Sequence, residues 1–125
     1  MPTTKAKLTP RELAIMHVVW DRGQATVRDV HDALSRERKV AYTTVMTLMN
    51  ILATKGHLIR RRDERAHVYS PTRPRHQAVA RLVSDFVDRV FSGSAQPLLL
   101  HLVKHEKLTA AERAELRRLI DELED

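Results

Sequence analysis

The 125-residue sequence contains no cysteine, and aromatic residues make up only 4% of it. The absence of cysteine excludes disulfides and thiolate metal sites and fits a cytoplasmic protein. With so few aromatic rings, the core must consist mainly of aliphatic side chains and methionine. The chain also lacks an apolar run of the roughly 20 residues that a membrane helix needs, and its first residues lack the apolar region of a signal peptide. We therefore expect a cytoplasmic protein without membrane insertion.

Motifs for catalysis or for a cofactor are also missing. The sequence contains no nucleophile elbow, no phosphate-binding loop and no HExxH motif, which argues against an enzyme and against a bound cofactor. Among seven histidines, His101 and His105 are spaced to share a helix face. Two ligands do not make a metal site, so we expect no metal there.

The positive charge is confined to one part of the chain. Residues 1–72 hold 13 Lys/Arg and 7 Asp/Glu, a net charge of +6, whereas residues 73–125 hold nine of each. A basic module next to a neutral one is typical of a nucleic-acid reader joined to an oligomerisation domain. A basic surface that only confers solubility is the alternative reading.

Capping and turn residues predict three helices followed by a hairpin. Thr9 and Glu12 form a capping box for a helix that ends at Gly23, and Thr26 caps a second helix that extends to about Glu37. A third helix is expected over 42–55, with strands over 58–62 and 67–69. The predicted fold class is mainly α: a winged helix-turn-helix with a small two-stranded β wing in residues 1–72, plus a C-terminal helical dimerisation domain in residues 73–125.

The third helix has an unusual exposed face. Its predicted buried face contains Val45, Leu48, Met49 and Leu52, and the opposite face carries threonine and asparagine without a charge before Lys55. Short hydroxyl and amide side chains suit a helix lying close to base edges in the major groove. An ordinary polar surface is the alternative. The predicted base-reading residues are Thr43, Thr44, Thr47 and Asn50.

The hairpin predicts a phosphate-binding surface, because its arginines are closely spaced. Such residues position a protein on the duplex without specifying sequence, although a run of three arginines is also common on solvated surfaces. The predicted phosphate and wing residues are Arg28, Lys55, Arg60, Arg62, Arg65 and His67.

The C-terminal segment carries apolar stripes that about 50 residues are too few to bury. Pairing with a second copy covers them, and folding back on the first domain is the alternative. The predicted dimerisation residues are Val79, Leu82, Val83, Phe86, Val87, Val90, Leu116, Leu119, Ile120 and Leu123.

Three motifs together resemble the penicillinase repressor family of the BlaI/MecI type: Leu8 to Trp20 with Glu12, Thr44-Val45-Met46-Thr47-Leu48, and Tyr69-Ser70-Pro71. The resemblance covers nearly the whole chain. It implies a homodimeric repressor that binds an inverted-repeat operator, a third helix that enters the major groove with Thr44 and Thr47 at the DNA, and control of β-lactam-response genes.

The resemblance also implies release from DNA by proteolysis, through a membrane sensor protease system. The family's cleaved Asn–Phe bond corresponds to His101 and Leu102, a departure from the pattern, and the chain lacks the C-terminal cysteines of a copper-responsive branch. A function of another class stays open from sequence: a winged-helix interaction module that docks a protein partner rather than DNA. Binding to DNA fragments discriminates between the two.

Overall fold

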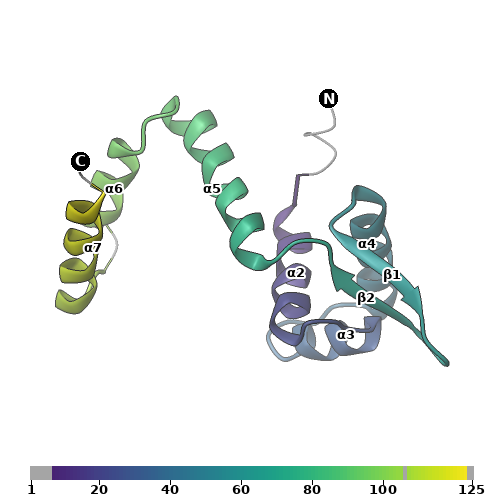
Figure 1. Ribbon diagram of the computed structural model, residues 1–125. Helices are drawn as coiled ribbons and strands as arrows, with labels where there is room; N and C mark the ends of the chain where they lie inside the picture. The colour runs from purple at the N-terminus through teal and green to yellow at the C-terminus, as the bar shows by residue number, and fades with distance from the viewer. Residues whose placement is uncertain (1–6, 106, 124–125) are drawn as a thin grey trace. The chain divides into compact units, whose positions relative to one another are not determined.

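The computed structural model describes residues 7–105 and 107–123 (Figure 1). The chain forms two compact units, Met1–Val79 and Ala80–Asp125, and helix α5 (Arg75–Phe91) contains the border between them. The predicted domain border after residue 72 falls at the end of the hairpin, just before this helix.

The first unit begins with three helices whose ends follow the capping residues. Helix α2 spans Pro10–Arg22, α3 spans Val27–Ser35 and α4 spans Tyr42–Lys55. The capping boxes at Thr9 and Thr26 are both formed, which confirms the two predicted helix starts. Helix α3 ends earlier than the predicted Glu37, because the chain turns tightly after Ser35, with backbone bonds from residues 36–38 to Ala33 and Leu34.

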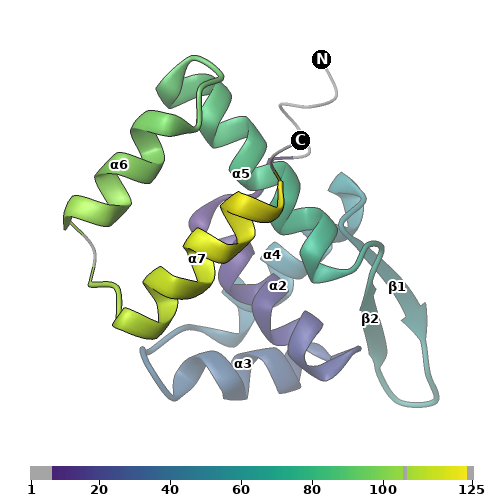
Figure 2. The same cartoon turned by 60° about the vertical axis from the view of Figure 1, so that its left-hand side comes forward.

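A two-stranded antiparallel hairpin follows α4. Strand β1 spans Leu58–Arg62 and β2 spans His67–Pro71. Figure 2 shows the hairpin extending beyond the three helices. Ala25, between α2 and α3, pairs with Tyr69 of β2 through two backbone hydrogen bonds of 2.8 and 2.9 Å. This pairing attaches the base of the wing to the loop between the helices.

The core of the first unit lies where the helices and the base of the wing meet. Each helix contributes a row of aliphatic side chains to the core, and Leu58 and Tyr69 of the hairpin belong to the same cluster. Of the four residues expected on the inner face of α4, three are fully buried and Leu48 is half-buried. The buried hydrophobic residues are Ile15, Met16, Val19, Ala25, Val27, Val30, Val45, Met49, Leu52, Leu58 and Tyr69.

The second unit contains most of α5, then α6 (Gln96–His105) and α7 (Ala110–Glu122). The chain turns after α5, with Ser92 and Gly93 at φ values of 53° and 85°. Thr109 and Glu112 form a capping box at the start of α7. Within the described residues, none of these three helices contributes a fully buried side chain. None of the described helices is long and apolar enough to span a bilayer.

Candidate nucleic-acid interface

The outer face of α4 has the composition that the sequence predicts. Thr43, Thr47 and Thr54 are exposed, whereas Thr44 and Asn50 are half-buried. No acidic or basic side chain occurs on this helix before Lys55. The helix therefore presents short, uncharged side chains to solvent, and it lies directly before the arginine-rich β1.

Asn50 connects α4 to both strands of the wing. Its Oδ1 accepts a hydrogen bond of 3.0 Å from Arg60 Nη1 and one of 2.7 Å from the hydroxyl of Tyr69, whose side chain is almost fully buried. A carbonyl oxygen has two lone pairs, so both are used here. A bidentate pairing of asparagine with adenine needs this same oxygen as an acceptor. In the structure Asn50 uses it to hold the wing against α4, and base reading by Asn50 stays a prediction.

The wing presents its arginines at the surface. In the register of the hairpin, Arg60 lies opposite Tyr69 and Arg62 lies opposite His67, so these two arginines share one face of the hairpin. Arg62, Arg65 and His67 are exposed, and Arg60 is exposed although its guanidinium reaches Asn50. These residues form a basic surface next to the uncharged face of α4.

Lys55 is engaged within the first unit rather than offered to a ligand. Its Nζ lies 2.8 and 3.0 Å from the two carboxylate oxygens of Glu12 and donates to the backbone oxygen of Lys7 at 3.0 Å. The side chains of Glu12 and Lys55 retain 3% and 20% of their exposure. This ion pair joins α2 to α4 across 43 positions of sequence, so the structure does not support the expected phosphate role of Lys55.

The carboxyl of Glu12 is stabilised in its charged form. Burial raises its pKa, but the hydrogen bonds from Lys55 and Thr9, together with the charge of Lys55, outweigh burial and hold the pKa below its ordinary value. A charged carboxylate is therefore buried with a matched cation, and the capping box of α2 and the position of α4 depend on the same residue.

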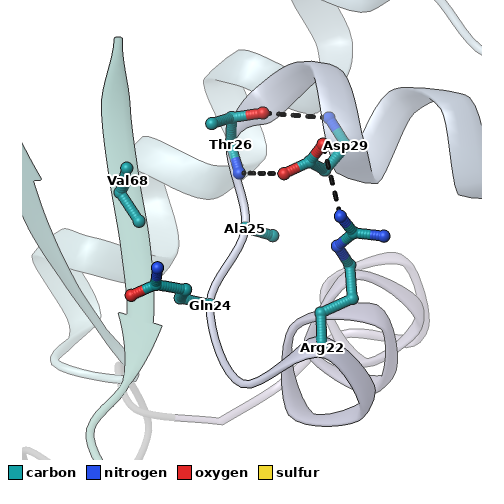
Figure 3. Close-up of a pocket in the computed structure, with 6 residues that line it drawn as sticks. All are labelled: Arg22, Gln24, Ala25, Thr26, Asp29 and Val68. Atoms are coloured by element: carbon teal, nitrogen blue, oxygen red, sulfur yellow. Dashed lines mark hydrogen bonds and ion pairs between the residues drawn. The ribbon is translucent and has the colours of Figure 1, made fainter. Parts of the chain in front are cut away.

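The start of α3 is held by a second carboxyl network, whose side chains are partly exposed (Figure 3). Thr26 donates its backbone N–H to Asp29 Oδ2 at 3.0 Å, and Arg22 lies 3.5 Å from Asp29 Oδ1. The hydrogen bond from the backbone of Thr26 is the main cause of a lowered pKa of Asp29. Arg22, Gln24, Thr26 and Asp29 line a hollow of about 440 Å³ with Val68 of the wing. Arg28, the predicted phosphate contact on α3, is exposed beside this network.

The C-terminal helices expose the predicted dimerisation stripe. Phe86 on α5 is 42% exposed and Ile120 on α7 is 52% exposed. Val79, Leu82 and Val87 are half-buried, and the remaining residues are exposed: Val83, Val90, Leu116, Leu119 and Leu123. Since the charged residues of these helices do not shield this stripe from water, it is a candidate surface for another molecule.

His101 and Leu102, at the position of the family's cleaved bond, are exposed within α6. The rings of His101 and His105 lie 4.5 Å apart, centroid to centroid. Among residues 7–105 and 107–123, no three His, Asp or Glu side chains gather in a way that would hold a metal ion.

Sequence reasoning missed two residues of the interface. The sequence motifs include Tyr69 only in Tyr69-Ser70-Pro71, yet its hydroxyl donates a hydrogen bond to Asn50. Ile51 is absent from the predicted base-reading residues, although it is 37% exposed on the outer face of α4. The 3.6-residue period places Ile51 about one turn after Thr47, and that signal was available in the sequence.

Known proteins are similar to this chain over most of its length. The family model described as "Penicillinase repressor" matches residues 8–122. The "Transcriptional regulator BlaI" of Mycobacterium tuberculosis is 45% identical over 124 residues, covering 95% of this chain and 88% of that protein. The penicillinase repressor of Bacillus licheniformis is 23% identical over 116 residues, covering 93% of this chain and 91% of that protein.

Two solved structures share the fold. The solution structure of the DNA-binding domain of the repressor BlaI has a TM-score of 0.51 at 26% identity, covering 55% of this chain and 84% of that chain. BpsR of Bordetella bronchiseptica has a TM-score of 0.51 at 19% identity, covering 99% of this chain and 79% of that chain. The first comparison confirms the winged-helix fold of the predicted reader.

Proposed function

Since the chain belongs to the penicillinase repressor family, we propose that it represses transcription by placing α4 in the major groove of an operator. The observation that carries this proposal is the pairing of two surfaces. An α4 face of exposed threonines, without a charge before Lys55, lies beside a hairpin with three consecutive arginines. Uncharged side chains approach base edges closely, and arginines attract phosphate.

The proposal divides base contacts and phosphate contacts between α4 and the wing. Thr43, Thr44 and Thr47 on α4 contact bases, and Arg62 and Arg65 on the wing contact phosphates. His67, opposite Arg62 in the register, and Arg28 at the start of α3 add to the phosphate surface. Arg60 is oriented by Asn50 and contributes its charge from a fixed position. Lys55 has no part in binding, since its ammonium is neutralised by Glu12.

The active form is a homodimer that binds an inverted repeat. The support for this form is the apolar stripe of α5 and α7, in which no described residue is fully buried and Phe86 and Ile120 are exposed. A second copy offers the same stripe, so the two surfaces match by symmetry. Two readers related by a twofold axis then recognise two half-sites related by the same axis.

The regulated genes are those of the β-lactam response. The support is that relatives bear the names penicillinase repressor and "Methicillin resistance regulatory protein MecI". Release from the operator proceeds in the cytoplasm through a membrane sensor protease system. Cleavage at His101–Leu102 needs α6 to open locally, because a protease binds its substrate in extended form and both residues are helical.

Salt dependence tests the proposal. We expect the logarithm of the affinity for a duplex to fall linearly with the logarithm of the salt concentration, because arginines displace counterions from phosphates. Arg62→Ala should weaken binding to specific and random duplexes alike and lower the slope by about 1. Thr47→Ala should instead reduce the difference between the two duplexes and keep the slope. Fluorescence anisotropy measures both, and a protein that binds no duplex at low salt would contradict the proposal and favour a protein partner.

The variant Asn50→Ala tests whether Asn50 holds the wing or reads a base. Removal of the carboxamide leaves the buried Tyr69 hydroxyl without its acceptor and frees Arg60. We expect a similar loss of affinity for specific and random duplexes, with faster hydrogen exchange in β1 and β2. Tyr69→Phe, which removes only one of the two hydrogen bonds, should produce a smaller loss of the same kind. A loss confined to the specific duplex would show that Asn50 reads a base.

A further inference from the structure

An apolar hollow lies on the outer face of α4. It has a volume of about 560 Å³ and is lined by Thr47, Asn50, Ile51, Thr54 and Lys55. Ile51 is 37% exposed, whereas Leu52, its neighbour in sequence, is fully buried. A large aliphatic side chain is thus placed at the surface of a helix whose opposite face already supplies the core.

Two polar groups that line this hollow, the ammonium of Lys55 and the carbonyl oxygen of Asn50, are engaged within the protein. The ammonium of Lys55 is held by Glu12 and by the backbone oxygen of Lys7. The carbonyl oxygen of Asn50 accepts from Arg60 and Tyr69. What the hollow offers a ligand is therefore the side chain of Ile51 between the short side chains of Thr47 and Thr54, and this surface suits an apolar group of small size.

The position of the hollow indicates which ligand carries an apolar group that fits it. Ile51 is four residues after Thr47, so the two side chains point in directions about 40° apart on the same face of the helix. The wing, with Arg60, Arg61 and Arg62, follows directly after α4 and is complementary in charge to a nucleic acid. Among the groups on base edges in the major groove, the apolar one is the C5 methyl of thymine.

We infer that Ile51 is a specificity-determining residue that packs against a thymine methyl in each half-site. The inference rests on the proposed function and deepens it, because it names the feature of the base pair that α4 recognises. With the carbonyl of Asn50 already occupied, recognition along this part of α4 depends on apolar contact and shape rather than on a bidentate amide–adenine pair.

Replacement of thymine by deoxyuridine tests the inference, since it removes only the methyl group. The probe is the duplex most enriched by the wild-type protein from a random-sequence pool, prepared with one symmetric pair of thymines replaced at a time. Affinities are measured by fluorescence anisotropy for the wild type, Ile51→Ala and a matched control, Ile59→Ala. Ile59 is also an exposed isoleucine, but it lies on β1 rather than α4.

At one pair of positions we expect deoxyuridine to weaken wild-type binding by about three- to fivefold per half-site, the fold-change that corresponds to burial of one methyl group. The loss should disappear in Ile51→Ala and persist in Ile59→Ala. A loss that persists in Ile51→Ala, or a wild type that binds the selected duplex equally well with and without every methyl, would overturn the inference. Failure to enrich any duplex would instead contradict the proposed function.

Discussion

Phe86→Asp should convert the proposed dimer into a monomer and weaken operator binding by about a hundredfold or more, the amount that linkage of two readers typically contributes. Phe86 is an exposed ring in the apolar stripe of α5. In a symmetric interface both copies of the residue change together, so the variant buries two uncompensated carboxylates. Light scattering after size-exclusion chromatography measures the mass, and anisotropy measures the affinity.

Ser84→Asp provides the matched control for this variant. Ser84 is exposed on the same helix, and a rotation of about 200° separates it from Phe86. The same charge on the opposite side of α5 should leave both the mass and the affinity unchanged. If Phe86→Asp remained a dimer, or became a monomer without loss of affinity, the proposed dimeric mode of binding would be wrong.

Lys55→Met should lower the free energy of unfolding by about 3 kcal/mol, the low end of the range for removing one partner of a buried ion pair. The low end applies because Lys55 keeps some contact with water, while the carboxylate of Glu12 is almost completely buried and loses its cation. Urea denaturation monitored by circular dichroism measures the change. The effect should fall on stability rather than on the salt dependence of DNA binding, because the ammonium of Lys55 is paired with Glu12 within the first unit.

A double variant distinguishes the ion pair from simple packing. In Glu12→Gln/Lys55→Met the charge that Lys55 compensates is gone, and glutamine still accepts from the N–H of Thr9 in the capping box. The double variant should regain most of the unfolding free energy that Lys55→Met loses. If the effects of the two single variants simply added, the two side chains would not be coupled, and the role given to this pair would fail.

The pH dependence of this pair has a definite sign. The pKa of Glu12 in the folded protein lies below its ordinary value of 4.5. The stability that the pair contributes is therefore complete above pH 4.5 and is lost as the pH falls through the lower, folded pKa. The loss of unfolding free energy caused by Lys55→Met should become smaller in the same acid range.

The helices and the wing were predictable because their ends are encoded locally. Thr9 with Glu12, Thr26 with Asp29 and Gly56 after α4 each act within a few residues, and the structure has all three at helix ends. The burial pattern of α4 followed equally well from its period. The end of α3 was less predictable, because the tight turn after Ser35 competes with continuation of the helix and no strong terminating residue marks it.

The roles of Asn50 and Lys55 were not predictable from spacing. Asn50 meets Tyr69 across 19 positions, and Lys55 meets Glu12 across 43 positions. Both residues belong to types that are common at DNA interfaces. For this reason the sequence predicts a base contact for Asn50 and a phosphate contact for Lys55. Only the folded arrangement shows that their polar groups join elements of the protein. The proposed interface therefore contains fewer residues than the sequence predicts: the threonines and Ile51 on α4, with the arginines of the wing.

Selection of bound duplexes from a random-sequence pool, followed by sequencing, tests the central claim that a dimer reads DNA through α4. We predict that the wild type enriches an inverted repeat whose half-sites lie about one helical turn, or a small multiple of it, apart. Thr47→Ala should enrich the same repeat with preference lost at one position in each half. Enrichment of no motif, of a single unrepeated site, or of an identical motif by Thr47→Ala would contradict the account.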